Sequence, residues 1–90
     1  MAVRFHPHAR QRMAERGATE DEVRATVLEG EQWPAQFGRV GFRRNFPFEA
    51  EWHRQFYRVK QVEAYAVREG GDWLVITVIT RYFSRRDTDV

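Results

Sequence analysis

The first stretch with helical spacing covers residues 6–17, where the apolar residues Ala9 and Met13 lie four positions apart. Side chains at this spacing share one face of a helix and can pack on a core. Pro7 suits the first helical position, because its missing N–H would have no partner there, and Gly17 suits the left-handed residue that ends a helix. The pattern predicts a short helix with defined ends, preceded by a short edge strand.

A second helix is predicted over residues 18–30. Thr19 and Glu22 have the spacing of a capping box, in which each side chain bonds the backbone N–H of the other residue. Acidic residues crowd the first turn, where the helix dipole favours negative charge. Val23 and Val27 supply an apolar face. We expect this acidic helix to be structural.

From residue 39 onward the apolar positions recur with period two, which is typical of strands. The connection before them holds Trp33 and Phe37, which we expect to fold back onto the core. Strands are predicted over 39–46, 52–59, 62–68 and 73–82, with a turn at 47–51, a break or bulge at 60–61 and a hairpin turn at 69–72. The last strand is rich in β-branched residues and is expected to be central. The order of elements predicts an α+β fold with three to four antiparallel strands.

The composition is that of a single globular domain. The 90 residues are 42% hydrophobic and 31% charged, which is unlike a disordered chain. We expect one domain over residues 1–84 and a polar tail over 85–90. The core of so short a chain is small, and a homodimer would enlarge it. The sequence has no cysteine, no basic-then-apolar leader and no apolar run of membrane length, so the expected location is the cytoplasm.

Basic residues suggest a partner. The net charge is +2, and 14 of the 15 basic residues are Arg. Guanidinium groups match phosphate oxygens and stack on bases, which favours nucleic acid, although biased genome composition also produces an Arg excess. Residues 39–58 alternate Arg with aromatic side chains, a mixture that suits single-stranded RNA. The expected nucleic-acid contacts are Arg39, Arg43, Arg44, Asn45, Arg54, Arg58 and Lys60. In the plainer interpretation, alternation simply places aromatic residues in the core and Arg in solvent.

One face of the first predicted helix combines His8, Arg12 and Arg16 at intervals of four residues. An imidazole exchanges protons near neutral pH, and two guanidinium groups can hold a phosphate. We therefore predict metal-independent cleavage of RNA with His8 as base or acid and the two Arg residues as a phosphate clamp. The competing interpretations are that His8 bonds a nearby backbone group and that both Arg residues pair with the acidic second helix.

Further catalytic partners must come from the later strands, where Glu63, Tyr65 and Arg81 carry suitable groups, with Lys60 beside them. Other chemistries have less support. The sequence has no Gly-rich phosphate loop, and the lack of cysteine removes thiol chemistry. The two histidines near the start have no third ligand at helical spacing, so we expect neither a metal ion nor another cofactor.

The segments His8-Ala9, Arg12-Met13 and Glu15-Arg16-Gly17, an acidic second helix and a late Val-Ile-Thr-Val strand together resemble the domain of unknown function 4258 family. That family is similar to the RelE/ParE toxins and to barnase-like nucleases. The resemblance spans residues 5–83. It implies two N-terminal helices packed on a twisted antiparallel sheet, and it makes His8, Arg12 and Arg16 the positions of the family motif. This chain departs from the pattern by a second histidine, His6, and by a longer last strand.

These observations predict a metal-independent endoribonuclease of the toxin–antitoxin type. Its expected partners are RNA, including ribosome-associated mRNA, and a small acidic protein resembling an antitoxin. One alternative is a non-catalytic toxin-like domain that binds a protein target, such as a topoisomerase or an antitoxin, through its basic face. The other is a nucleic-acid-binding module, whose affinity would fall steeply with salt.

Overall fold

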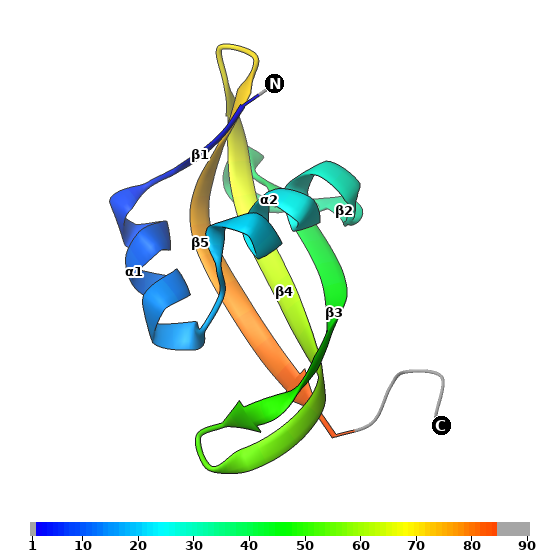
Figure 1. Cartoon of the computed structure of the whole chain (residues 1–90). Helices are drawn as coiled ribbons and strands as arrows, with labels where there is room; N and C mark the ends of the chain where they lie inside the picture. Colours follow the sequence, from blue (N-terminus) through cyan, green and yellow to red (C-terminus); the bar gives the residue numbers. More distant parts are fainter. Residues whose placement is uncertain (1, 85–90) are drawn as a thin grey trace.

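The computed structural model describes residues 2–84, which form two α-helices and a five-stranded sheet. Both helices pack on the same face of the sheet (Figure 1). The helices are α1 (Pro7–Arg16), α2 (Glu20–Glu29) and the short 3-10 helix η1 (Gln36–Gly38). The strands are β1 (Val3–Phe5), β2 (Glu31–Pro34), β3 (Val40–Trp52), β4 (Gln55–Glu69) and β5 (Asp72–Phe83). The predicted α+β class is confirmed, with five strands instead of three to four.

The helix ends lie where the capping residues predicted them. The His6 ring accepts a hydrogen bond from the backbone N–H of His8 at 3.0 Å and so caps α1. Gly17 ends α1 with a left-handed φ of 75°. Thr19 and Glu22 form the capping box at the start of α2, with bonds of 3.0 and 3.1 Å. Side-chain caps of this kind stabilise a helix by about 1 kcal/mol.

The strands follow the order β1-β5-β4-β3-β2, so β4 is central. The prediction that residues 73–82 form the central strand is therefore wrong. β4 is the longest strand and pairs along most of its length with both β3 and β5. The remaining edge of β5 pairs with β1, and this pairing is parallel, which makes the sheet mixed. The predicted edge strand before α1 is confirmed.

The predicted turn at residues 47–51 is wrong, because β3 continues through this segment. A change of register between Pro47 and Ala50 marks a bulge, after which pairing with β4 resumes. The chain reverses later, at His53 and Arg54, whose φ angles are 51° and 69°. Tight hairpin turns with this geometry usually contain Asn or Gly. His53 and Arg54 are not typical of such a turn, so the sequence does not indicate it.

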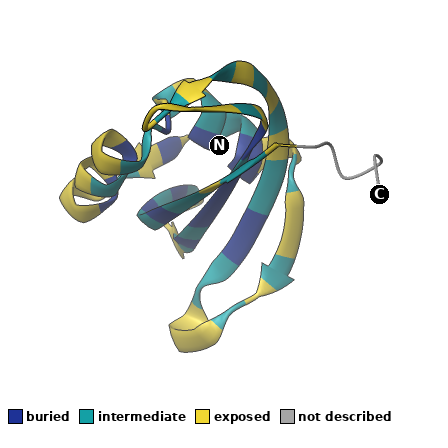
Figure 2. Cartoon of the chain, turned by 90° about the horizontal axis from the view of Figure 1, so that it is seen from below, coloured by how far each residue is buried: buried dark blue, intermediate teal, exposed yellow. Residues whose placement is uncertain are grey.

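The hydrophobic core lies between the helices and the sheet, where Figure 2 shows buried positions on the strands and on the inner sides of the helices. Ala9 and Met13 of α1 face it, as do Val23 and Val27 of α2, in agreement with the sequence pattern. The remaining buried members are Val3, Ala18, Phe42, Val62, Ala64, Ala66, Trp73, Val75 and Val78. Burial of a side chain as large as Phe42 stabilises the fold by about 2–3 kcal/mol.

Two further expectations concern the end of the chain and membrane-spanning segments. The predicted polar tail over residues 85–90 lies outside the described residues. Within residues 2–84 no helix is long and apolar enough to cross a membrane, since α1 and α2 have 10 residues each.

Candidate functional site

The face of the sheet opposite α1 and α2, called the open face below, is built from three rows of side chains. Residues paired across strands point to the same side of a sheet, so the register fixes each row. The rows are Trp33, Gly41, Tyr65 and Thr77; Glu31, Arg43, Glu63 and Ile79; and Asn45, Gln61 and Arg81. Three predicted catalytic residues, Glu63, Tyr65 and Arg81, therefore share one surface.

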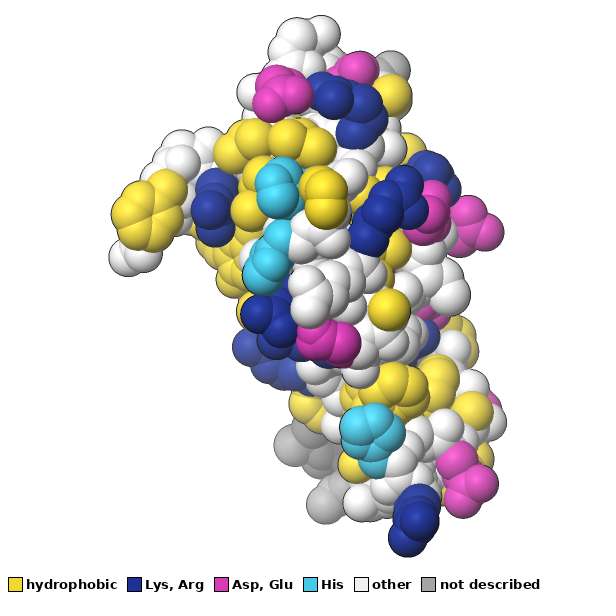
Figure 3. All heavy atoms as spheres, turned by 90° about the vertical axis from the view of Figure 1, so that its left-hand side faces the viewer, with side chains coloured by type: hydrophobic (Ala, Val, Ile, Leu, Met, Phe, Trp, Pro, Cys, Tyr) yellow, Lys and Arg dark blue, Asp and Glu magenta, His cyan; other side chains and the backbone are white. Residues whose placement is uncertain are grey.

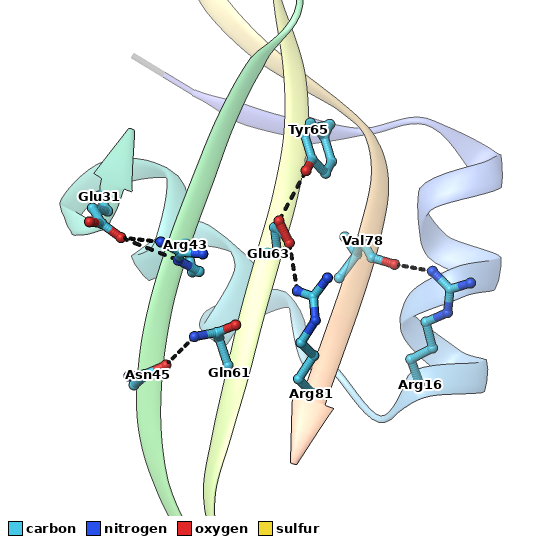
Figure 4. Close-up of polar contacts among 9 residues, drawn as sticks. All are labelled: Arg16, Glu31, Arg43, Asn45, Gln61, Glu63, Tyr65, Val78 and Arg81. Atoms are coloured by element: carbon cyan, nitrogen blue, oxygen red, sulfur yellow. Dashed lines mark hydrogen bonds and ion pairs between the residues drawn. The ribbon is translucent and has the colours of Figure 1, made fainter. Parts of the chain in front are cut away.

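The Glu63 carboxylate lies at the centre of the open face. Its Oε1 accepts a hydrogen bond from the Tyr65 hydroxyl at 3.0 Å, and its Oε2 accepts one from the Arg81 guanidinium at 2.7 Å (Figure 4). The Glu63 side chain is 7% exposed and that of Arg81 is 49% exposed. A carboxylate this poorly hydrated requires such partners, because burial of an unpaired charge is costly. We call these three residues the carboxylate cluster.

The hydroxyl of Tyr65 is held in its protonated form. Burial raises the pKa of Tyr65 above its ordinary value, and the hydrogen bond to Glu63 raises the pKa further. At neutral pH this hydroxyl is a proton donor that contacts a carboxylate, which is a proton acceptor. General acid–base catalysis needs at least one group that donates a proton and one that accepts a proton, and Tyr65 and Glu63 are such a pair.

Arg43 adds a second cation to the open face. Its guanidinium donates to Glu31 at 2.9 Å and lies 5.3 Å from the centroid of the Trp33 ring. The hydrogen bond and then the charge of Glu31 raise the pKa of Arg43, so this residue remains cationic. Beside it, Gln61 donates to Asn45 at 3.0 Å. A polar hollow of about 310 Å³ is lined by Glu31, Arg43, Arg44, Asn45 and Gln61.

A larger hollow of about 500 Å³, called the apolar pocket below, opens at the Tyr65 end of the open face. It is lined by Trp33, Ala35, Gln36, Phe37, Arg39, Tyr65, Thr77 and Ile79. Trp33 and Phe37 therefore do not fold back onto the core, contrary to expectation. Trp33 is paired with Gly41 and shares its side of the sheet, and Phe37 is 85% exposed.

The predicted stripe on α1 lies beside the outer edge of β5. Arg16 uses its guanidinium to donate to the backbone carbonyl of Val78 at 2.6 Å (Figure 4). Arg12 donates to both carboxylate oxygens of Glu15, at 3.2 Å each. Within residues 2–84 neither Arg residue pairs with α2, so the expectation of salt bridges to that helix is wrong. α2 is reached instead by Arg10.

His8 is exposed at the start of α1, and Figure 3 shows histidine and basic side chains close together on this side of the molecule. Its backbone N–H donates to the His6 ring, whereas its own ring forms no hydrogen bond or ion pair with Glu63, Tyr65 or Arg81 among residues 2–84. The structure therefore gathers the three predicted catalytic residues of the sheet and leaves the α1 stripe as a separate group.

Lys60 lies on the helix-covered face and not on the open face. Its side chain is 5% exposed, and the ammonium group contacts Glu22 and the backbone carbonyl of Gly17 at 2.8 Å each. β4 is continuous here and keeps its register with both neighbouring strands, so the break or bulge predicted at residues 60–61 is wrong. The buried ammonium joins the sheet to both helices, and it is not available to a phosphate in this arrangement.

The Arg residues predicted to bind nucleic acid lie in three different parts of the structure. Arg44 points to the helix-covered side and pairs with Glu29 at 2.6 Å. Arg54 and Arg58 are exposed near the β3–β4 hairpin turn. Of the residues predicted to bind nucleic acid, Arg39 lines the apolar pocket together with Tyr65 of the carboxylate cluster, and Arg43, Arg44 and Asn45 line the polar hollow.

The side chains within residues 2–84 include no group of three or more His, Asp or Glu residues placed to hold a metal ion. Comparison of the chain with family models, curated proteins and solved structures finds no match. The functional argument therefore depends on the chemistry of the open face.

Proposed function

We propose that the open face binds single-stranded RNA and cleaves it without a metal ion, with the carboxylate cluster as the reactive centre. The observation that carries the proposal is the contact of a buried carboxylate with a protonated hydroxyl on one side and a half-exposed guanidinium on the other. RNA cleavage requires a base, an acid and a cation, and these three groups supply them.

The reaction assigned to the cluster is attack of a ribose 2′-oxygen on the adjacent phosphorus. Glu63 accepts the 2′-hydroxyl proton while the bond between this oxygen and phosphorus forms. Tyr65 donates its proton to the 5′-oxygen as the bond from phosphorus to that oxygen breaks. The products are a 2′,3′-cyclic phosphate and a free 5′-hydroxyl, and a proton transfer from Glu63 to Tyr65 restores the enzyme.

Arg81 and Arg43 are assigned to the phosphate. Half of the Arg81 side chain is exposed, so its guanidinium can contact a phosphate oxygen while remaining beside Glu63. Arg43 lies in the same row as Glu63, on the neighbouring strand. A fixed cation near the phosphorus lowers the barrier because it stabilises the charge that develops on the non-bridging oxygens.

The toxin–antitoxin type is part of this proposal. It is supported by the resemblance to the domain of unknown function 4258 family and by the Arg-rich composition. A free ribonuclease would harm its own cell, so a small acidic protein that covers the open face is the expected partner. The α1 stripe lies outside the proposed reactive centre, and we assign no proton transfer to His8.

The direct experiment incubates the purified chain with 5′-labelled single-stranded RNA in EDTA and analyses the product ends. We expect cleavage to products with 2′,3′-cyclic phosphate and 5′-hydroxyl ends, and no cleavage where the attacking sugar is 2′-deoxy. Binding of the RNA without cleavage would instead favour the nucleic-acid-binding module. Absence of both binding and cleavage would overturn the assignment of RNA as the substrate.

A further inference from the structure

The apolar pocket adjoins the carboxylate cluster, because Tyr65 belongs to both. The Tyr65 hydroxyl bonds Glu63, while its ring lines the pocket together with Thr77 and Ile79. A ligand that occupied both places would carry an anionic group near Arg81 and Arg43 and a flat apolar group over the Tyr65 ring. A nucleotide has this combination.

From this continuity we propose that the apolar pocket binds one nucleobase of the RNA, next to the phosphate held at the carboxylate cluster. The inference deepens the proposed function and rests on it. The pocket volume of about 500 Å³ lies within the range of small-molecule sites and is sufficient for a base.

The aromatic side chains of Trp33, Phe37 and Tyr65 line this space. Trp33 meets the Tyr65 ring edge to face, with centroids 6.1 Å apart. Phe37 also lines the pocket and is 85% exposed, so most of its side chain is accessible to a ligand. Exposed rings of this kind bind bases of any sequence by stacking, because every base has a π-face.

Phe37 is also held in a costly conformation. Its φ and ψ angles are 61° and 35°, in the left-handed region that bulky residues rarely adopt. The Arg39 guanidinium lies 5.9 Å from the centroid of the Phe37 ring. The polar side chains of Gln36 and Thr77 complete the lining and can hydrogen-bond the edges of a base.

The test is an NMR titration of the labelled protein with the four ribonucleoside 5′-monophosphates, their deoxy counterparts and ribose 5-phosphate. Ribonucleotides should shift the Trp33 indole and Ile79 methyl signals, whereas ribose 5-phosphate should shift signals near Arg43 and Arg81 only. Phe37→Gly, which removes the ring and tolerates the left-handed backbone, should weaken nucleotide binding at least about fivefold. Phe56→Ala removes another exposed aromatic ring and should leave the affinity unchanged.

Equal affinity for ribonucleotides and ribose 5-phosphate, or an unchanged affinity of Phe37→Gly, would overturn the base site. Tighter binding of deoxynucleotides than of ribonucleotides would overturn the assignment to RNA. The titration needs no turnover, so base binding without RNA cleavage refutes the enzymatic proposal alone. RNA cleavage without base binding refutes the pocket alone.

Discussion

Arg81 of β5 contacts Glu63 of the neighbouring strand β4 diagonally on the open face. In register, Arg81 of β5 lies opposite Gln61 of β4, and Glu63 lies opposite Ile79, yet the guanidinium donates to the carboxylate at 2.7 Å. The acceptor is nearly buried and the donor is half exposed. Such a pair can present its cation to a phosphate while its anion stays fixed, which is the geometry that the proposed reaction needs.

Removal of the Arg81 cation should destabilise the fold. Arg81→Met leaves the Glu63 carboxylate with the Tyr65 hydroxyl as its remaining partner in the cluster, so we expect a loss of about 1–3 kcal/mol in the free energy of unfolding. Urea denaturation monitored by tryptophan fluorescence measures this loss. The matched control is Arg54→Met at the exposed hairpin turn. A loss in the control equal to that in Arg81→Met would show that the pair contributes nothing specific.

Lys60 should act on stability and not on RNA. Lys60→Met leaves the Glu22 carboxylate without the buried ammonium, and we expect a loss of about 2–4 kcal/mol. Adding Glu22→Gln, which retains an acceptor for the capping box, should recover part of that loss in a double-mutant cycle. RNA affinity of the folded protein should be unchanged. A drop in affinity as large as that caused by Arg43→Met would restore the original expectation for Lys60.

Alkaline pH should destabilise the protein through two tyrosines. Burial raises the pKa of Tyr65 and of Tyr82 above the ordinary value of 10.0. A group with a raised pKa in the folded state stabilises the fold fully below its unfolded pKa, and this contribution is lost as the pH rises through the folded pKa. Unfolding free energies should therefore fall above about pH 10. Replacement of both residues by Phe should flatten the decline, and a pH profile identical to wild type would contradict this origin.

Gly41 is required because the Trp33 ring covers it. A Cβ atom at Gly41 would lie 2.5 Å from the ring. Gly41→Ala should displace Trp33 from the apolar pocket and cost about 1–3 kcal/mol, which is typical of overpacking. Trp33 indole NMR shifts and urea denaturation measure the two effects. Gly38→Ala, where an added Cβ meets no atom within 4 Å, should leave the Trp33 signal in place, although its left-handed φ will cost some stability.

Much of the fold could be predicted from the sequence, because caps and alternation are local signals. Pro7, Gly17 and the Thr19 capping box fix both helices, and period two places Glu63 and Tyr65 on the same side of one strand. Parallel pairing of β1 depends on contacts between distant segments, which no local pattern encodes. The hairpin turn at His53 and Arg54 cannot be recognised from the sequence, because both residues have positive φ angles that their residue types rarely adopt.

The candidate site likewise contains residues that a local pattern predicts and residues whose position depends on contacts between distant segments. Strand alternation correctly grouped Glu63 and Tyr65, and Arg81 joins them through pairing of β4 with β5. Lys60 falls on the opposite face of its strand, and its burial depends on Glu22, nearly 40 residues earlier in the chain. Phe37 was expected in the core because it is apolar, yet its left-handed backbone presents the ring to solvent. Side-chain direction in a short loop cannot be obtained from residue type alone.

The measurement that tests the central claim most directly is the first-order rate of RNA cleavage in EDTA by three proteins at saturating concentration: wild type, Glu63→Gln and His8→Ala. Glu63→Gln keeps the size and one acceptor of the side chain but cannot serve as the base. Its rate should fall at least about 100-fold, whereas that of His8→Ala should stay within about threefold of wild type. Equal rates for wild type and Glu63→Gln, or loss of cleavage in His8→Ala alone, would contradict the placement of the reactive centre on the open face.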